Sequence, residues 1–262
     1  MKTAQLLLLL LHLTSLAFAQ SFDFSCPSSF SGNIIGQGQV AQRVVVDHKG
    51  DSHYYYTISP SPGWVFLGIN TTGSFLAMPE ADLYENGRAG ELTAVHFIQV
   101  DTRVVSGTNL HIQRGATDEI DGAVGFLSRA LQQLGSTPSH TTDIFLLTER
   151  SSGYSFSGLA DGDNVYINGF ASFSPYILLH EIGHNWAAAR SEVTTGEPWA
   201  SFYRDHCISR YGQSAVWEYI AEAFALYHGA DIGYQNRCHG HDRQLSQLPG
   251  PVQAEFNRLL RP

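Results

Sequence analysis

The sequence predicts an α+β fold, with an N-terminal mixed β-sheet followed by a mainly helical C-terminal lobe. Up to about Gly107, short β-branched or aromatic runs alternate with turn sequences such as Pro-Gly and Asn-Gly. Beyond that point, longer segments carry apolar residues at helical spacing. No internal repeat or clear linker interrupts the 262 residues, so we expect the strand-rich residues 20–110 and the region 111–262 to belong to one domain.

The individual elements follow from these patterns. The expected strands are Val44–Val46, His53–Ile58, Val65–Ile69, Ala94–Val100, Asp143–Thr148 and Asn164–Asn168. The expected helices are Asp118–Leu134, Pro175–Arg190, Ser214–His228 and a shorter one near Val252–Leu260. Ser174 suits the N-cap of the second helix, and Pro175 suits its first position.

The composition excludes several classes of partner. The formal charge is −9, with 15 Lys and Arg against 24 Asp and Glu. Nucleic acids and anionic membranes are bound through basic patches, so neither partner is expected. With 43% hydrophobic and only 15% charged residues, the chain should be globular, and we expect a monomer.

Residues 1–19 are predicted to be a secretory signal peptide. Lys2 precedes a leucine-rich run that ends at the small-x-small sequence Ala17-Phe18-Ala19. The run is shorter than the roughly 20 residues that a membrane-spanning helix needs. The protein is therefore expected to be secreted, in an extracellular environment that permits disulfides.

Two further features fit an exported protein. Cys26, Cys207 and Cys238 allow three pairings with one thiol left over, and we favour Cys207–Cys238. Asn70 begins an Asn-Thr-Thr sequence and is a candidate glycosylation site.

The segment His180-Glu181-Ile182-Gly183-His184 carries the strongest chemical signal. On a helix His180 and His184 lie one turn apart on the same face, which is the spacing that chelates one metal ion. Glu181 can reach a water bound to that metal without being a ligand. This H-E-x-x-H pattern predicts one zinc ion held by two imidazoles, with Glu181 as general base.

Glu218 and Glu222 lie one turn apart on the next helix, which is otherwise mostly apolar. Two carboxylates facing a core repel each other unless a cation lies between them. One of them can complete the metal site, and the other can accept the free N–H of a ligating histidine. The spacing alone leaves open which glutamate is the ligand.

Two blocks of the chain carry a family resemblance: His180-Glu181-x-Gly183-His184, and Tyr211-Gly212 followed by Glu218-Tyr219-Ile220-Ala221-Glu222-Ala223-Phe224 and Leu226. They resemble the catalytic domain of anthrax lethal factor and the related Pro-Pro endopeptidases, which are secreted zinc metallopeptidases of the gluzincin group. The resemblance implies zinc ligands His180, His184 and Glu218 in a zincin-like fold. It also implies Glu181 as general base, Tyr211 as oxyanion donor, and Glu222 as support for a ligand.

This resemblance predicts a secreted zinc metalloendopeptidase that acts on proteins or peptides. It also implies that the strand before the active-site helix is a sheet edge that aligns the substrate, and we expect Asn164–Asn168 there.

A second alignment, of Ala221-Glu222-Ala223-Phe224-Ala225, is similar to aminopeptidase-like gluzincins and would make Glu222 the third ligand. Further alternatives are a non-catalytic secreted zinc-binding protein and a zinc hydrolase of other substrates. A second metal site at His239-Gly240-His241 is a weaker hypothesis.

Overall fold

A computed structural model describes residues 23–24, 28–47, 49–69, 77–78, 81–85, 92, 94–114, 120–147, 157–168, 174–194, 197–231, 238 and 248–260. The predicted signal peptide, Cys26, Asn70 and the His239–His241 sequence lie outside the described residues. The helices in the described ranges include none with the length and hydrophobicity of a membrane-spanning segment.

The first part of the chain forms an antiparallel sheet. Among the described residues this sheet has five strands, β1 (Asp23–Phe24), β2 (Ser28–Ser29), β4 (Gly38–Val46), β5 (Ser52–Pro60) and β8 (Ala81–Glu85). Their period-2 patterning places Tyr56 and Ile58 of β5 in a small core with Phe66, Val95 and Phe97. The Tyr56 hydroxyl accepts a hydrogen bond from the Leu92 amide at 2.9 Å, so this buried hydroxyl has a partner.

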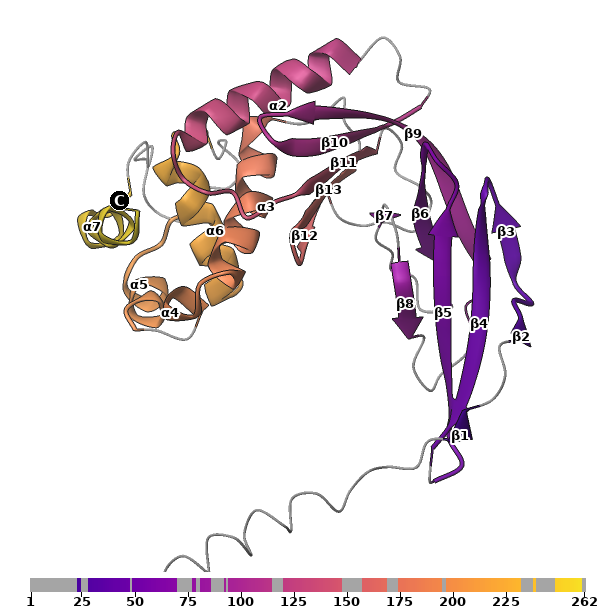
Figure 1. Ribbon diagram of the computed structural model, residues 1–262. Coiled ribbons are helices and arrows are strands. Elements are labelled where there is room, and N and C mark those ends of the chain that lie inside the picture. Colours follow the sequence, from indigo (N-terminus) through magenta and orange to yellow (C-terminus); the bar gives the residue numbers. More distant parts are fainter. Residues whose placement is uncertain are drawn as a thin grey trace, which may run out of the picture.

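A second, mixed sheet connects this part to the rest of the molecule. Its described strands run in the order β12-β13-β11-β10-β9-β6-β7, with β3 also paired to β9. Their bounds are β3 (Asn33–Ile35), β6 (Trp64–Ile69), β7 (Ala77–Met78), β9 (Ala94–Val105), β10 (Thr108–Gln113), β11 (Asp143–Leu147), β12 (Gly158–Asp161) and β13 (Asn164–Asn168). The start of β9 pairs with β6 and its end with β10. This long strand therefore connects the part of the sheet that contains β6 with the part that contains β10 (Figure 1).

The described helices are α2 (Ile120–Leu134), α3 (Pro175–Ala188), α4 (Ser191–Thr194), α5 (Trp199–Asp205), α6 (Val216–Tyr227) and α7 (Gly250–Leu259). Helices α2 and α3 contact the part of this sheet that contains β9 to β13, and the other described helices pack mainly on helices. The central helix is α3, which contacts β12 and β13 on one side and α6 on another. Figure 1 shows α3 and α6 side by side next to β12 and β13. The main core joins apolar residues of β10, β11 and β13 to those of α2, α3, α6 and α7.

The α+β class and the expected strands and helices are confirmed in this structure, with ends that differ by a few residues. The pattern missed the strands β1, β2, β3, β7, β8, β10 and β12 and the short helices α4 and α5. One expectation is wrong: Asn164–Asn168 is not a sheet edge, because β12 pairs with it antiparallel on the outer side and β11 pairs with it on the inner side. Among the described strands, the edge next to α3 is therefore β12.

Candidate metal centre

Helix α3 presents apolar residues to the core and the side chains of His180 and His184 to α6. Leu178, Ile182 and Trp186 are fully buried in the main core, as their spacing predicts. The helix begins at Pro175, and Ser174 is in an extended conformation at the N-cap, where its side chain makes no capping hydrogen bond. The one-turn spacing then brings His180 and His184 to the same face.

Three ligand atoms converge between α3 and α6. The Nε2 atoms of His180 and His184 are 3.2 Å apart. Glu218 Oε2 lies 3.1 Å from His180 Nε2 and 3.3 Å from His184 Nε2. In the described part of the chain, this is the group of histidine and acidic side chains whose geometry could hold a metal ion. The structure thus brings together the three residues that the resemblance implies as ligands.

Glu222 occupies a different position beside the same histidine. Its Oε1 lies 2.9 Å from His180 Nδ1, the ring nitrogen opposite to the one that faces Glu218. Its side chain is fully buried and also accepts a hydrogen bond from the Tyr176 hydroxyl. A carboxylate at Nδ1 fixes the tautomer and orientation of the ring and leaves Nε2 free to bind a metal. This geometry favours Glu218 over Glu222 as third ligand.

A close approach of two helices makes this convergence possible. Gly183 of α3 faces Ala221 and Phe224 of α6, and a Cβ added to it would lie 3.1 Å from Ala221 Cα and 3.0 Å from Phe224 Cβ. In this close approach, Glu218 and Glu222 of α6 both contact His180 of α3. The glycine inside the H-E-x-x-H sequence therefore has a packing role.

Glu181 lies beside the metal ligands, against the edge strand. It is buried and has a backbone hydrogen bond with Ala160 of β12. Gly158 of the same strand leaves room for it, since a Cβ there would lie 2.5 Å from Glu181 Oε1. Burial raises the pKa of Glu181 above its usual value, which suits a group that must accept and release a proton.

Tyr211 lies beside this site, in the loop between α5 and α6. Its ring centroid lies 5.5 Å from that of His180, and about half of the residue is exposed. Burial and the charge of Glu218 raise the pKa of Tyr211 to about 12, so the phenol keeps its proton at neutral pH. It can therefore act as a hydrogen-bond donor.

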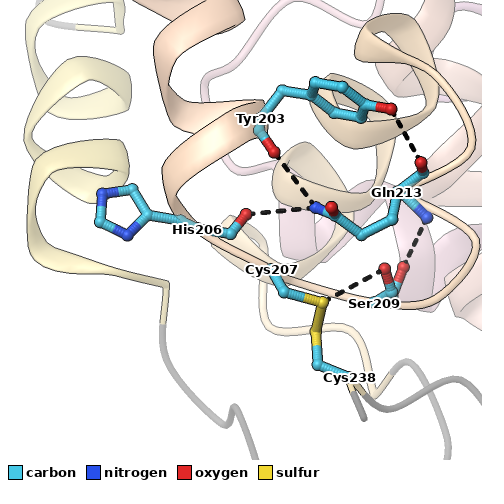
Figure 2. The surroundings of a disulfide bond; sticks show 7 residues. Tyr203, His206, Cys207, Ser209, Gln213 and Cys238 are labelled. Carbon is cyan, nitrogen blue, oxygen red and sulfur yellow. Dashed lines mark hydrogen bonds between the residues drawn. A yellow bond between two sulfur atoms is a disulfide. The ribbon is translucent and has the colours of Figure 1, made fainter.

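The loop that carries Tyr211 is braced by the residues around it. The side-chain Nε2 of Gln213 donates hydrogen bonds to the main-chain oxygens of Tyr203 and His206. The main-chain oxygen of Gln213 accepts a hydrogen bond from the Tyr203 hydroxyl (Figure 2). Cys207 and Cys238 lie at disulfide distance, with Cα atoms 6.0 Å apart, so the favoured pairing is confirmed. This disulfide ties residue 238 to the start of the same loop.

The charges at the centre favour a bound cation. Burial alone would lower the pKa of His180, but hydrogen bonds with Glu218 and Glu222 raise it to about 10. Burial would likewise raise the pKa of Glu218, but hydrogen bonds with His180 and His184 hold it well below the usual range. The two carboxylates thus attract positive charge into the space between the helices.

The sequence analysis missed several residues that shape this site. Tyr176 lies four positions before His180, so its i, i+4, i+8 spacing with the two histidines could have indicated that it shares their face. The buried Asn185 donates to Thr141 Oγ1 and to the Asn164 carbonyl, which fixes α3 against β13. No single-residue signal marks Gln213, because its three contacts depend on how the loop folds.

Comparison with models of protein families, with curated proteins and with solved structures finds no match for this chain.

Proposed function

We propose that this protein is a secreted zinc metalloendopeptidase, with residues 111–262 forming a zincin-like catalytic region. The observation that carries the proposal is the triangle of His180, His184 and Glu218 ligand atoms with the buried carboxylate of Glu181 beside it. The disulfide fits an oxidising compartment, which supports export of the chain.

The ligand geometry supports zinc. The three ligand atoms are separated by 3.1, 3.2 and 3.3 Å. In a tetrahedral site with bonds of about 2.0–2.1 Å, ligand atoms lie roughly 3.3–3.4 Å apart. Two imidazoles and one carboxylate are a donor set typical of catalytic zinc, which keeps a fourth position for water or substrate. Bound zinc would supply Lewis-acid polarisation and a water whose pKa is lowered to about 7.

The protein residues supply the remaining chemistry of peptide hydrolysis. The Glu181 carboxylate takes a proton from the attacking water and passes it to the leaving amine. The protonated Tyr211 phenol donates a hydrogen bond to the oxygen on which negative charge develops. The outer edge of β12 can align an extended peptide by main-chain hydrogen bonds, as proposed earlier for Asn164–Asn168.

The test is a Glu181→Ala variant, with the exposed Glu197→Ala as matched control. Cleavage of a protein or peptide-library substrate is measured with and without a chelator, and zinc content is measured in parallel. We expect Glu181→Ala to keep its zinc and to lose about 10²–10⁴-fold in turnover, while Glu197→Ala behaves as wild type.

Cleavage by Glu181→Ala at the wild-type rate would contradict the mechanism. Zinc binding by a wild-type protein that cleaves no peptide would instead favour a non-catalytic binding protein or a hydrolase of other substrates.

A further inference from the structure

Two hollows lie on either side of Glu181 and Tyr211. One, of about 300 Å³, lies toward the start of α3 and includes Tyr176 and Ile177 in its lining. The other, of about 550 Å³, lies toward the end of α3 and also includes His184 and Glu218. Gly158 of β12 contributes to both, so a peptide that follows this edge strand would pass from one hollow to the other.

The larger hollow has mostly apolar walls. Beyond the metal centre they are formed by Leu159, Ala187, Ala188, Val216, Trp217 and Ile220. Within the described residues that line it, Asp161 is the charged side chain outside the metal centre, and it is exposed to solvent. Asn185 directs its amide N–H groups to Thr141 and Asn164. An apolar group can therefore enter without displacing a buried polar partner.

Trp217 is the feature that distinguishes this wall. It is 64% exposed, although it lies on the first turn of α6 directly before Glu218. Leaving an indole in water is unfavourable, and exposed aromatic side chains beside a cleft commonly mark the position of a binding partner. Ile220 follows at i+3, so both side chains can contact one group in the cleft.

We propose that this hollow receives an aromatic or large aliphatic side chain of an extended peptide substrate, next to the scissile bond, and that Trp217 is its main specificity-determining residue. The inference rests on the proposed peptidase function. It adds to that function the class of substrate residue that the enzyme selects.

The test compares substrates within each enzyme variant. A peptide library first locates the position whose side chain most affects cleavage, and matched peptides then carry Phe, Ala, Asp or Lys at that position. Values of kcat/KM are measured for wild type, Trp217→Ala, Trp217→Phe and Val104→Ala. Val104 is a matched control because it is 69% exposed and does not line the hollow.

We expect wild type to prefer Phe over Ala by at least about 10-fold, and Trp217→Ala to lose most of this ratio. Trp217→Phe should restore most of it, and Val104→Ala should leave it unchanged. Because the ratio compares two substrates of one variant, a general loss caused by disturbing Glu218 cancels. Binding provides a readout without turnover: in a Glu181→Ala background, calorimetry should give the same order of affinities for the uncleaved peptides.

A Phe/Ala ratio that Trp217→Ala leaves unchanged, or a wild-type preference for Asp or Lys, would overturn this inference alone. Absence of any peptide cleavage by wild type would overturn the proposed function and this inference together.

Discussion

The first part of the molecule, around β4 and β5, and the second part, around α3 and α6, bury different kinds of side chain. The core of the first part consists of Tyr56, Ile58, Phe66, Leu92, Val95 and Phe97. Among the described residues up to 92, only Gln42 has a buried polar side chain. It donates a hydrogen bond to the Tyr56 hydroxyl at 3.4 Å. Helices α3 and α6 instead bury an imidazole and two carboxylates, those of His180, Glu181 and Glu222.

This difference indicates where function lies. Removing ionised groups from water has a penalty of several kcal/mol per ion, and apolar residues of similar size would give a core at least as stable. Among the described residues of the first part, the core contains no buried charged side chain. The acidic and imidazole groups between α3 and α6 are therefore best explained by a cation that they bind.

Removal of the metal should have the largest effect, and it should affect α3 and α6 much more than β4 and β5. A ligand at 1,000 times its dissociation constant stabilises the folded state by about 4 kcal/mol. On chelation we expect amide hydrogen exchange to accelerate in α3 and α6, since Glu218 and Glu222 then lose a neighbouring cation. Exchange in β4 and β5 should change much less. Equal acceleration in both parts, or none in α3 and α6, would contradict the proposed location of the metal.

A smaller effect is expected from the helix contact that positions the ligands. Gly183→Ala places a Cβ against Ala221 and Phe224, so α6 must shift by a few tenths of an ångström. We expect zinc affinity, measured by competition with a chromogenic chelator, to fall by about 10-fold, a change typical of disturbed ligand support.

Gly122→Ala on α2 is the matched control for Gly183→Ala. A Cβ there meets nothing within 4 Å, so zinc affinity should stay unchanged and the helix should gain up to about 1 kcal/mol. Unchanged affinity in Gly183→Ala would show that the close approach of the helices is not needed.

The smallest effect concerns pH and the end of α6. His228 is buried, its Nδ1 lies 3.0 Å from the Gln133 carbonyl, and burial lowers its pKa below the usual 6.5. The unfolded chain therefore binds this proton at a higher pH than the folded chain does. Consequently the free energy of unfolding decreases as the pH falls through about 6.5 toward the lower folded-state pKa.

His228→Asn should reduce this acid sensitivity, because asparagine can donate to Gln133 but does not titrate. We expect urea unfolding at pH 7 and pH 5 to show a smaller loss of stability in His228→Asn than in wild type. His140→Asn, at an exposed position, should match wild type. An identical pH dependence of His228→Asn and wild type would exclude this role of His228.

Local sequence patterns were sufficient to predict the helices α3 and α6. Both helices are long and mostly apolar, and the separations of His180 from His184 and of Glu218 from Glu222 are properties of helix geometry. The coarse α+β class followed from the same periodicities. The choice between Glu218 and Glu222 did not, because it depends on which ring nitrogen of His180 each carboxylate faces.

Non-local pairing explains what the sequence could not predict. Strand β12 has four residues, Gly158-Leu159-Ala160-Asp161, and glycine and aspartate are uncommon in strands. It is held in place by pairing with β13 and by its contact with Glu181. The bracing of the Tyr211 loop likewise depends on Tyr203 and Gln213, which no motif connects.

The zinc-to-protein ratio of purified protein, measured side by side for wild type and Glu218→Ala after dialysis at a fixed free-zinc concentration, tests the metal centre most directly. We expect one zinc ion per wild-type chain and almost none in Glu218→Ala. A wild-type chain that takes up no zinc, or a Glu218→Ala chain that binds it as tightly as wild type, would contradict it.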